Sequence, residues 1–188
     1  MEADWEIEIG GAAPVIDAAW SGLIDLRAEP IRIREVCETT QLPGLAQALL
    51  QLNAPLSPVW TAKCDLWETT DFDADEMNAD PADANQALAC YIDLLPRSPR
   101  QWTSPEMAID ACKIWCSKLH SIPLANCRAD FVIRRAWITS DRETVGITAY
   151  LTACSADAPA AQITLTAALG ALASAVAPDS STSAEPSK

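Results

Sequence analysis

The chain has 188 residues, of which 49% are hydrophobic, so it is long and apolar enough to bury one hydrophobic core. Its 13 Lys and Arg stand against 26 Asp and Glu, which gives a net charge of −13. Nucleic acids and anionic membranes bind clustered positive charge, so this acidic balance disfavours both as partners. We predict one globular domain over residues 1–177, and we expect any charged partner to be basic.

The N-terminal residues MEADWEIEIGG are acidic, whereas a secretory signal begins with basic residues and continues with an apolar run. No stretch looks apolar enough over the roughly 20 residues that a membrane-spanning helix needs. Seven cysteines, an odd number, lie scattered through predicted core strands and helices, which is typical of reduced, buried thiols. We therefore predict a cytoplasmic protein. Residues 178–188 are rich in Ser and Pro, and this composition predicts a disordered tail.

The first third of the chain contains two predicted strands and one well-patterned helix. Residues 5–9 read WEIEI, and this alternation of apolar and acidic residues has the period of a strand. Residues 20–27 alternate in the same way, which predicts a second strand. Pro30 is suited to begin a short helix. Leucines at intervals of three and four residues predict an amphipathic helix over residues 42–52.

The middle of the chain alternates between strand and helix patterns. Residues 59–67 are predicted to form a strand, and the Asp-, Ala- and Pro-rich residues 68–85 that follow are predicted to form a solvated loop. A strand pattern over residues 88–94 is followed by Ser104-Pro105-Glu106, which is typical of a helix start. Alternation returns over residues 131–137 and predicts a further strand.

The clearest strand pattern covers residues 145–153, and a Leu-rich helix pattern follows over residues 159–176. The predicted order is strand, strand, helix, three times over, in residues 5–53, 59–120 and 130–176. These units have little residue-level similarity, so a true ββα repeat is left open. Half-polar strands are typical of an antiparallel or mixed sheet with one covered face. We predict an α+β fold with one mostly antiparallel sheet of about six strands and helices on one face.

A metal site is suggested on paper by Cys112, Cys116, His120 and Cys127, which form C-x3-C-x3-H-x6-C. Residues 112 and 120 would lie about 12 Å apart along a helix, which is too far for both to hold one ion. Only Cys116, His120 and Cys127 remain as weak candidates, and the C-x2-C knuckle of structural zinc sites is missing. We favour buried packing cysteines, and we predict no metal and no cofactor.

Signs of catalysis are weak. His120 is the only histidine, and neither a Gly-x-Ser-x-Gly elbow nor a glycine-rich phosphate loop occurs. Asp71, Asp73 and Asp75 have the spacing of a calcium loop, but Glu76 stands where the sharp turn needs Gly. We expect a binding protein more than an enzyme.

Arg134 and Arg135 are adjacent in a predicted strand, so their side chains point to opposite faces of the sheet. A buried arginine needs a partner, and we expect Asp93 in the neighbouring strand pattern to be that partner. The pair is either purely structural or part of an anion-binding pocket with Tyr91.

The uncovered sheet face is the working surface that we predict. Mixed charges, Thr and Tyr on a flat sheet suit protein recognition better than catalysis. Two tryptophans that adjoin loops, if exposed, would anchor a partner. The predicted binding residues are Tyr91, Asp93, Arg134, Thr148, Tyr150, Thr152, Trp67 and Trp102.

The leading hypothesis is a small acidic protein-interaction module, such as an adaptor, an immunity-type inhibitor or a chaperone-like protein. The alternative is a small-molecule or anion-binding protein, or an enzyme, with a pocket around Tyr91, Asp93 and Arg134. A deep pocket with an unpaired Arg134 would favour this alternative, whereas a flat face with Trp67 or Trp102 exposed would favour protein binding. The sequence leaves the oligomeric state open.

Overall fold

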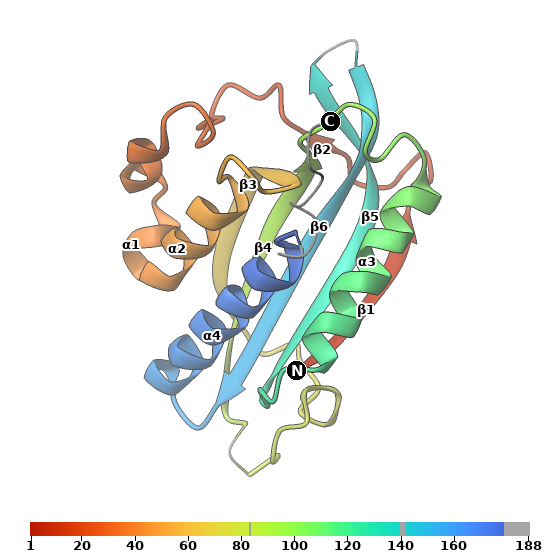
Figure 1. Ribbon diagram of the computed structural model, residues 1–188. Coiled ribbons are helices and arrows are strands. Elements are labelled where there is room, and N and C mark those ends of the chain that lie inside the picture. The colour runs from red at the N-terminus through yellow and green to blue at the C-terminus, as the bar shows by residue number, and fades with distance from the viewer. Residues whose placement is uncertain (83, 140–141, 179–188) are drawn as a thin grey trace, which may run out of the picture.

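The computed structural model describes residues 1–82, 84–139 and 142–178 (Figure 1). The predicted disordered tail therefore falls outside the described residues, apart from Pro178. In chain order the elements are β1 (Glu2–Glu8), β2 (Ile16–Asp17), the 3₁₀ helix η1 (Pro30–Glu35), α1 (Glu38–Gln41), α2 (Pro43–Leu52), β3 (Val59–Thr69), the 3₁₀ helix η2 (Asp75–Met77), β4 (Gln86–Pro96), α3 (Pro105–His120), β5 (Cys127–Thr139), β6 (Arg142–Ser155) and α4 (Ala158–Val176).

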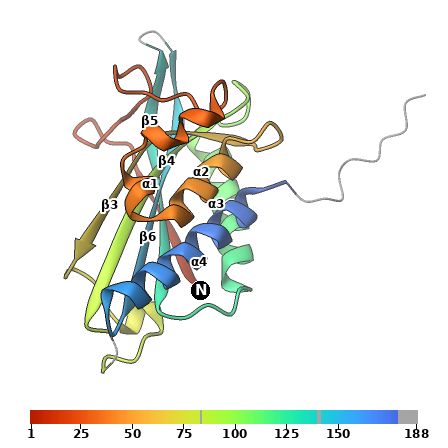
Figure 2. The ribbon, with the colours of Figure 1, turned by 90° about the vertical axis from the view of Figure 1, so that its left-hand side faces the viewer.

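One six-stranded sheet organises the fold. Its strand order is β1-β5-β6-β4-β3, and the short β2 pairs with β5. The pairs β3–β4, β4–β6 and β5–β6 are antiparallel, whereas β1 and β2 run parallel to β5. The α-helices pack against one side of this sheet (Figure 2). The predicted α+β fold with one mostly antiparallel sheet is confirmed, and the ββα repeat stays unconfirmed.

The main core lies between the sheet and the helices. On β6 every second residue from Val145 to Ala153 is apolar and buried, as the sequence pattern predicts. On α3 the buried residues recur at three- and four-residue spacing, as in Cys112, Trp115 and Leu119, so one side of the helix meets the sheet. The strand periodicity of two and the helix periodicity of 3.6 thus meet in one apolar layer.

Helix α4 lies in the middle of the helical layer, where it contacts α2, α3 and strand β6. Among the described residues it is also the one helix that is long and apolar enough, by length and composition, to cross a membrane. We expected no such stretch in this chain. A core helix has the same composition, and 44% of this apolar window is buried inside the protein.

The strand predicted over residues 20–27 is wrong, because this segment forms turns. The carboxylate of Asp25 accepts a hydrogen bond from the backbone amide of Arg27, and the Asp25 carbonyl accepts from Ala28 and Glu29. These local bonds compete with pairing to another strand. A strand here would turn Trp20 toward the core, whereas in the turns its side chain is 39% exposed.

Strand β3 contains a bulge between Thr61 and Cys64. The residues before the bulge therefore face the opposite side of the sheet from the side that a regular alternation along the strand would give them. Thr61 pairs with Leu94 and Cys64 pairs with Ile92, so β3 has one residue more than β4 between these pairs. Upstream of the bulge Trp60 therefore points away from the helices. It enters a small second cluster whose buried residues are Ile16, Ala18, Trp60, Ala62, Leu95 and Ala136.

The acidic segment 68–85 is less solvated than predicted. Its Met77 is 2% exposed and packs with Ala79, Ala87 and Cys154 in a third buried cluster. Alternation along the strands places this cluster and the second one on the sheet side away from the helices, at opposite ends. We call the uncovered stretch between them the helix-free face. On this face lie Trp67, Tyr91, Asp93, Arg134, Thr148, Tyr150 and Thr152, of which Asp93 and Thr148 are buried, with 6% and 1% of their surface exposed.

Candidate functional site

Three aromatic rings form a row across strands β3, β4 and β6 of the helix-free face. Tyr91 and Tyr150 are register partners, and their ring centroids lie 5.9 Å apart. Trp67 continues the row at 6.2 Å from Tyr91, and it is 38% exposed. Tilted rings at such distances attract one another and hold the row in place. We call Trp67, Tyr91 and Tyr150 the aromatic row.

A polar network lies beside the aromatic row. The Arg134 guanidinium donates to Glu8 Oε2 at 2.7 and 3.1 Å, to the Thr148 hydroxyl at 3.2 Å and to the Tyr150 hydroxyl at 3.1 Å. The Thr148 hydroxyl in turn donates to Asp93 Oδ1 at 2.7 Å. One chain of bonds thus joins strands β1, β5, β6 and β4.

The predicted direct pair between Arg134 and Asp93 is wrong. Strand β6 lies between β4 and β5, so the strands that carry these two residues are about 10 Å apart, which is two strand spacings. Thr148 on the intervening strand bridges them. The actual partner of Arg134 is Glu8, which lies beside it in the parallel register of β1 and β5.

Burial sets the protonation of the carboxyl and phenol groups at this face. Asp93 is 6% exposed, and this burial raises its pKa, against the opposing effects of the Thr148 hydrogen bond and of the Arg134 and Lys63 charges. Burial and the neighbouring Asp93 raise the pKa of Tyr91 to about 12. The phenol of Tyr91 is therefore neutral at physiological pH and available as a hydrogen-bond donor.

Replacing Asp93 with asparagine should stabilise the protein at neutral pH. The folded-state pKa of Asp93 is raised, so the folded state binds this proton more tightly than the unfolded state. The stabilisation from protonated Asp93 is complete below its unfolded pKa and disappears as the pH rises through the folded pKa. Asparagine keeps an acceptor for Thr148 without a charge.

Chemical denaturation from about pH 4, near the unfolded pKa of Asp93, to neutral pH tests the direction in which Asp93 changes stability with pH. The free energy of unfolding of Asp93→Asn should increasingly exceed that of the wild type as the pH rises. Asp65→Asn, an exposed change on the same face, corrects for the general effect of lowering the net charge. A difference that is constant or reversed across the titration would contradict the buried-carboxylate account.

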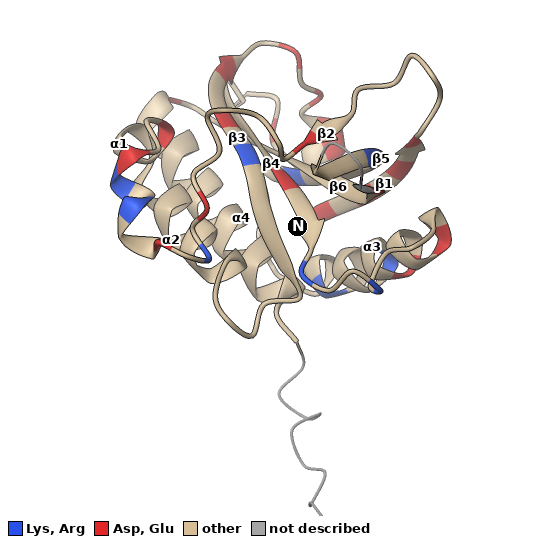
Figure 3. Cartoon of the chain, turned by 90° about the horizontal axis from the view of Figure 1, so that it is seen from above, with Lys and Arg blue, Asp and Glu red and all other residues tan. Residues whose placement is uncertain are grey.

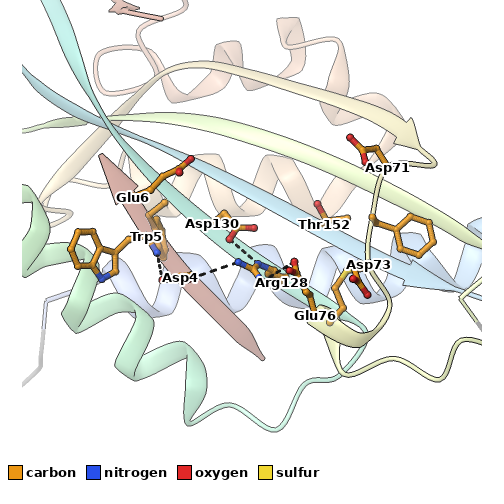
Figure 4. Close-up of a pocket in the computed structure, with 12 residues that line it drawn as sticks. Asp4, Trp5, Glu6, Asp71, Asp73, Glu76, Arg128, Asp130 and Thr152 are labelled. Carbon is orange, nitrogen blue, oxygen red and sulfur yellow. Dashed lines mark hydrogen bonds and ion pairs between the residues drawn. The ribbon is translucent and has the colours of Figure 1, made fainter. Parts of the chain in front are cut away.

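An acidic pocket of about 350 Å³ adjoins the row near the η2 segment (Figure 4). Arg128 reaches three of its carboxylates, with distances of 2.7 Å to Asp130, 3.0 Å to Glu76 and 4.0 Å to Asp4. Burial, offset in part by Arg128, raises the pKa of Asp130. The lining residues are Asp4, Trp5, Glu6, Asp71, Phe72, Asp73, Glu76, Met77, Arg128, Asp130, Phe131 and Thr152. Six acidic side chains around one arginine leave this end of the face strongly negative.

The structure brings together seven of the eight predicted binding residues and separates the eighth. Trp102 is 2% exposed, so it does not meet the condition of exposure under which it would anchor a partner. Its ring meets Trp115, which meets Phe131, at centroid distances of 5.9 and 5.5 Å. The segment before α3 turns inward at Trp102, so a position next to a loop does not imply exposure.

The weak metal candidates lie in different surroundings. Cys116 and Cys127 are buried, whereas His120 is exposed at the end of α3. In the described ranges no three or more His, Cys, Asp and Glu side chains are arranged to hold a metal ion. Burial raises the pKa of both Cys116 and Cys127 to about 11, so little thiolate forms at neutral pH. Neither thiol is activated as a nucleophile.

Sequence reasoning missed two contributors to this face. Glu8 was placed on the polar side of its strand, but the sequence contains no sign that β1 lies beside β5. No local pattern singles out Arg128 in the sequence, because its role in the pocket depends on the position of the η2 segment. Searches of protein-family models, curated proteins and solved structures found no match to this chain.

Proposed function

We propose that the chain is a protein-interaction module that recognises a basic partner protein through its helix-free face. The observation that carries this proposal is the aromatic row, which lies on an open sheet and ends on an exposed tryptophan. Trp and Tyr are the side chains most often found as energetic anchors of interfaces. An adaptor, an inhibitor or a chaperone-like protein would each use such a surface.

Charge supports a basic partner. The acidic pocket borders the aromatic row, and Asp and Glu also mark the strands and loops around the helix-free face (Figure 3). With a net charge of −13 the whole molecule attracts cations. Complementary charge of this kind raises association rates and selects partners. The seven cysteines are free thiols, and we keep the cytoplasm as the proposed compartment.

The alternative of an anion pocket around Tyr91, Asp93 and Arg134 has less support. Recognition of an anion requires a guanidinium that is free to bind it. Arg134 is already engaged by Glu8, Thr148 and Tyr150, and the Glu8 carboxylate paired with it would repel an anion. The geometry therefore favours a protein partner over a small anion.

Replacing Tyr150 with alanine should weaken partner binding at least tenfold, which is about 1.4 kcal/mol. The change removes one of the three rings of the aromatic row, and this ring lies outside the main core. Wild-type protein is used to capture partners from native lysate, and mass spectrometry identifies those it retains. The affinity of a purified partner is then measured for the wild type, Tyr150→Ala and Trp67→Ala.

A matched control comes from the opposite side of the molecule. Ile163 on α4 is 73% exposed, so Ile163→Ala removes an exposed apolar side chain without touching the helix-free face. This variant should bind like the wild type. Circular dichroism confirms that each variant is folded. Partner affinity that survives both Tyr150→Ala and Trp67→Ala unchanged would rule out the helix-free face as the binding surface.

A further inference from the structure

The outer edge of strand β3 has two different halves. Upstream of the bulge the outward backbone groups are occupied from within the protein, since the Val59 amide donates to the Ser57 hydroxyl at 3.2 Å and the Thr61 amide donates to Asn53 Oδ1 at 3.1 Å. These partners are buried and held by α2 and the turn after it. This half of the edge is closed to another strand.

Downstream of the bulge the edge has only a local cap. The Leu66 amide donates to the carboxylate of the preceding Asp65 at 2.8 Å, so it points away from β4. Alternate amides of an antiparallel strand share one direction, which makes the amides of Cys64 and Glu68 point outward as well. Asp65 is exposed and its side chain can turn away. In the described chain no further strand lies along this edge (Figure 2).

A groove of about 480 Å³ lies along β3 from Thr61 to Cys64, and it meets the open half of the edge at Cys64. Trp20, Ile24, Val36 and Leu49 supply apolar walls on the outer side of β3. Tyr91 also lines this groove, so the groove and the aromatic row form one continuous surface. An apolar side chain of a bound segment would find its site here.

The charges along this edge select the occupant. Asp65, Glu68 and Glu38 lie on or beside it, and Asp65 loses its amide partner when another strand takes the Leu66 amide. The nearby Lys63 is held over the Trp20 ring, with its ammonium 5.1 Å from the ring centroid. Carboxylates therefore dominate this edge, and basic side chains are their complement.

We propose that the β3 edge from Cys64 to Glu68 is a strand-addition site for an extended basic segment of the partner protein. The segment pairs with the outward groups of β3, displaces the Asp65 carboxylate, and places an apolar side chain in the groove. This inference rests on the proposed function, because it specifies how the same partner binds beside the aromatic row. Main-chain pairing supplies affinity in such complexes, and alternate side chains supply specificity.

A displayed library of random linear peptides, selected on the full-length wild-type protein, provides the probe. The selected peptides should alternate apolar residues with Lys or Arg. Each amide of a synthetic selected peptide is then methylated in turn. Methylation at every second position should lower affinity at least about tenfold, because only alternate amides face β3. Methylation at the other positions should leave affinity unchanged.

Two substitutions at one position test the edge from the side of the protein. Glu68→Pro removes the outward amide, and proline is tolerated where a strand amide faces away from its sheet neighbour. Glu68→Ala removes the same carboxylate and keeps the amide. The proline variant should bind the selected peptide at least about tenfold more weakly than the alanine variant. If the proline variant does not fold, the binding of the methylated peptides to the wild-type protein decides whether strand addition occurs.

The outcomes separate this inference from the proposed function. Binding that is lowered by Tyr150→Ala but is equal for Glu68→Pro and Glu68→Ala would overturn strand addition and keep the helix-free face. Binding that depends on Glu68→Pro but not on Tyr150→Ala would support the edge and overturn the face. Selection of no peptide would overturn strand addition, and the helix-free face would still be tested with the partner captured from lysate. A wild-type dimer that Glu68→Pro dissociates would show that a second copy is the occupant, and would overturn the basic partner.

Discussion

Replacing Trp102 with alanine should lower the free energy of unfolding by about 3–5 kcal/mol, the range found for large aromatic side chains in cores. Trp102 is among the largest fully buried side chains and packs edge-on against Trp115. Trp115 extends the cluster to Phe131 on strand β5. Alanine would leave a cavity at the junction of the sheet, helix α3 and the segment that precedes it.

Urea denaturation followed by circular dichroism measures this loss. Trp67→Ala is the control, because the same side chain is removed from an exposed position. The control should change the free energy of unfolding by less than about 1 kcal/mol. Similar losses for both variants would mean that Trp102 does not lie in the core.

Replacing Arg97 with alanine should cost about 2–3 kcal/mol of stability, although the residue is only partly buried. Its Nε donates to the Ser57 carbonyl at 2.7 Å, and its Nη2 donates to the carbonyls of Asn53 and Ala54 at 2.9 and 2.8 Å. A further contact of 3.4 Å reaches the Val59 carbonyl. One guanidinium thus satisfies the carbonyls that follow helix α2 and holds the turn into β3.

Arg100 offers a matched control within the same connection. It is exposed, so Arg100→Ala removes an equal charge and should leave stability within about 0.5 kcal/mol of the wild type. Thermal unfolding of the two variants in parallel makes the comparison. Equal melting temperatures would show that the carbonyls after α2 gain no stability from Arg97.

Local pattern was sufficient for much of the secondary structure. The alternation over residues 88–94 and 145–153 predicts strands that the structure places side by side as β4 and β6. The Ser-Pro-Glu start predicts a helix that begins at Pro105. These features depend on residues that are near one another in the chain, where backbone preference and apolar periodicity act together. They also place Tyr91 and Tyr150 on one polar face.

Long-range pairing determined what local pattern could not. The sequence does not specify that β6 separates β4 from β5, so Asp93 was assigned to Arg134 in place of Glu8. Similarly, a bulge in β3 changes which residues face outward only in relation to its partner β4. Trp102 is buried because a distant strand and helix receive its ring.

By itself the sequence determined the α+β class, most strands and helices, and the membership of the polar face. Each of these follows from the period of apolar residues within one element. Only the tertiary structure decided the strand order, the partner of Arg134, the burial of Trp102 and the free half of the β3 edge. Those depend on contacts between residues far apart in the chain, and such contacts exist only once the sheet has formed.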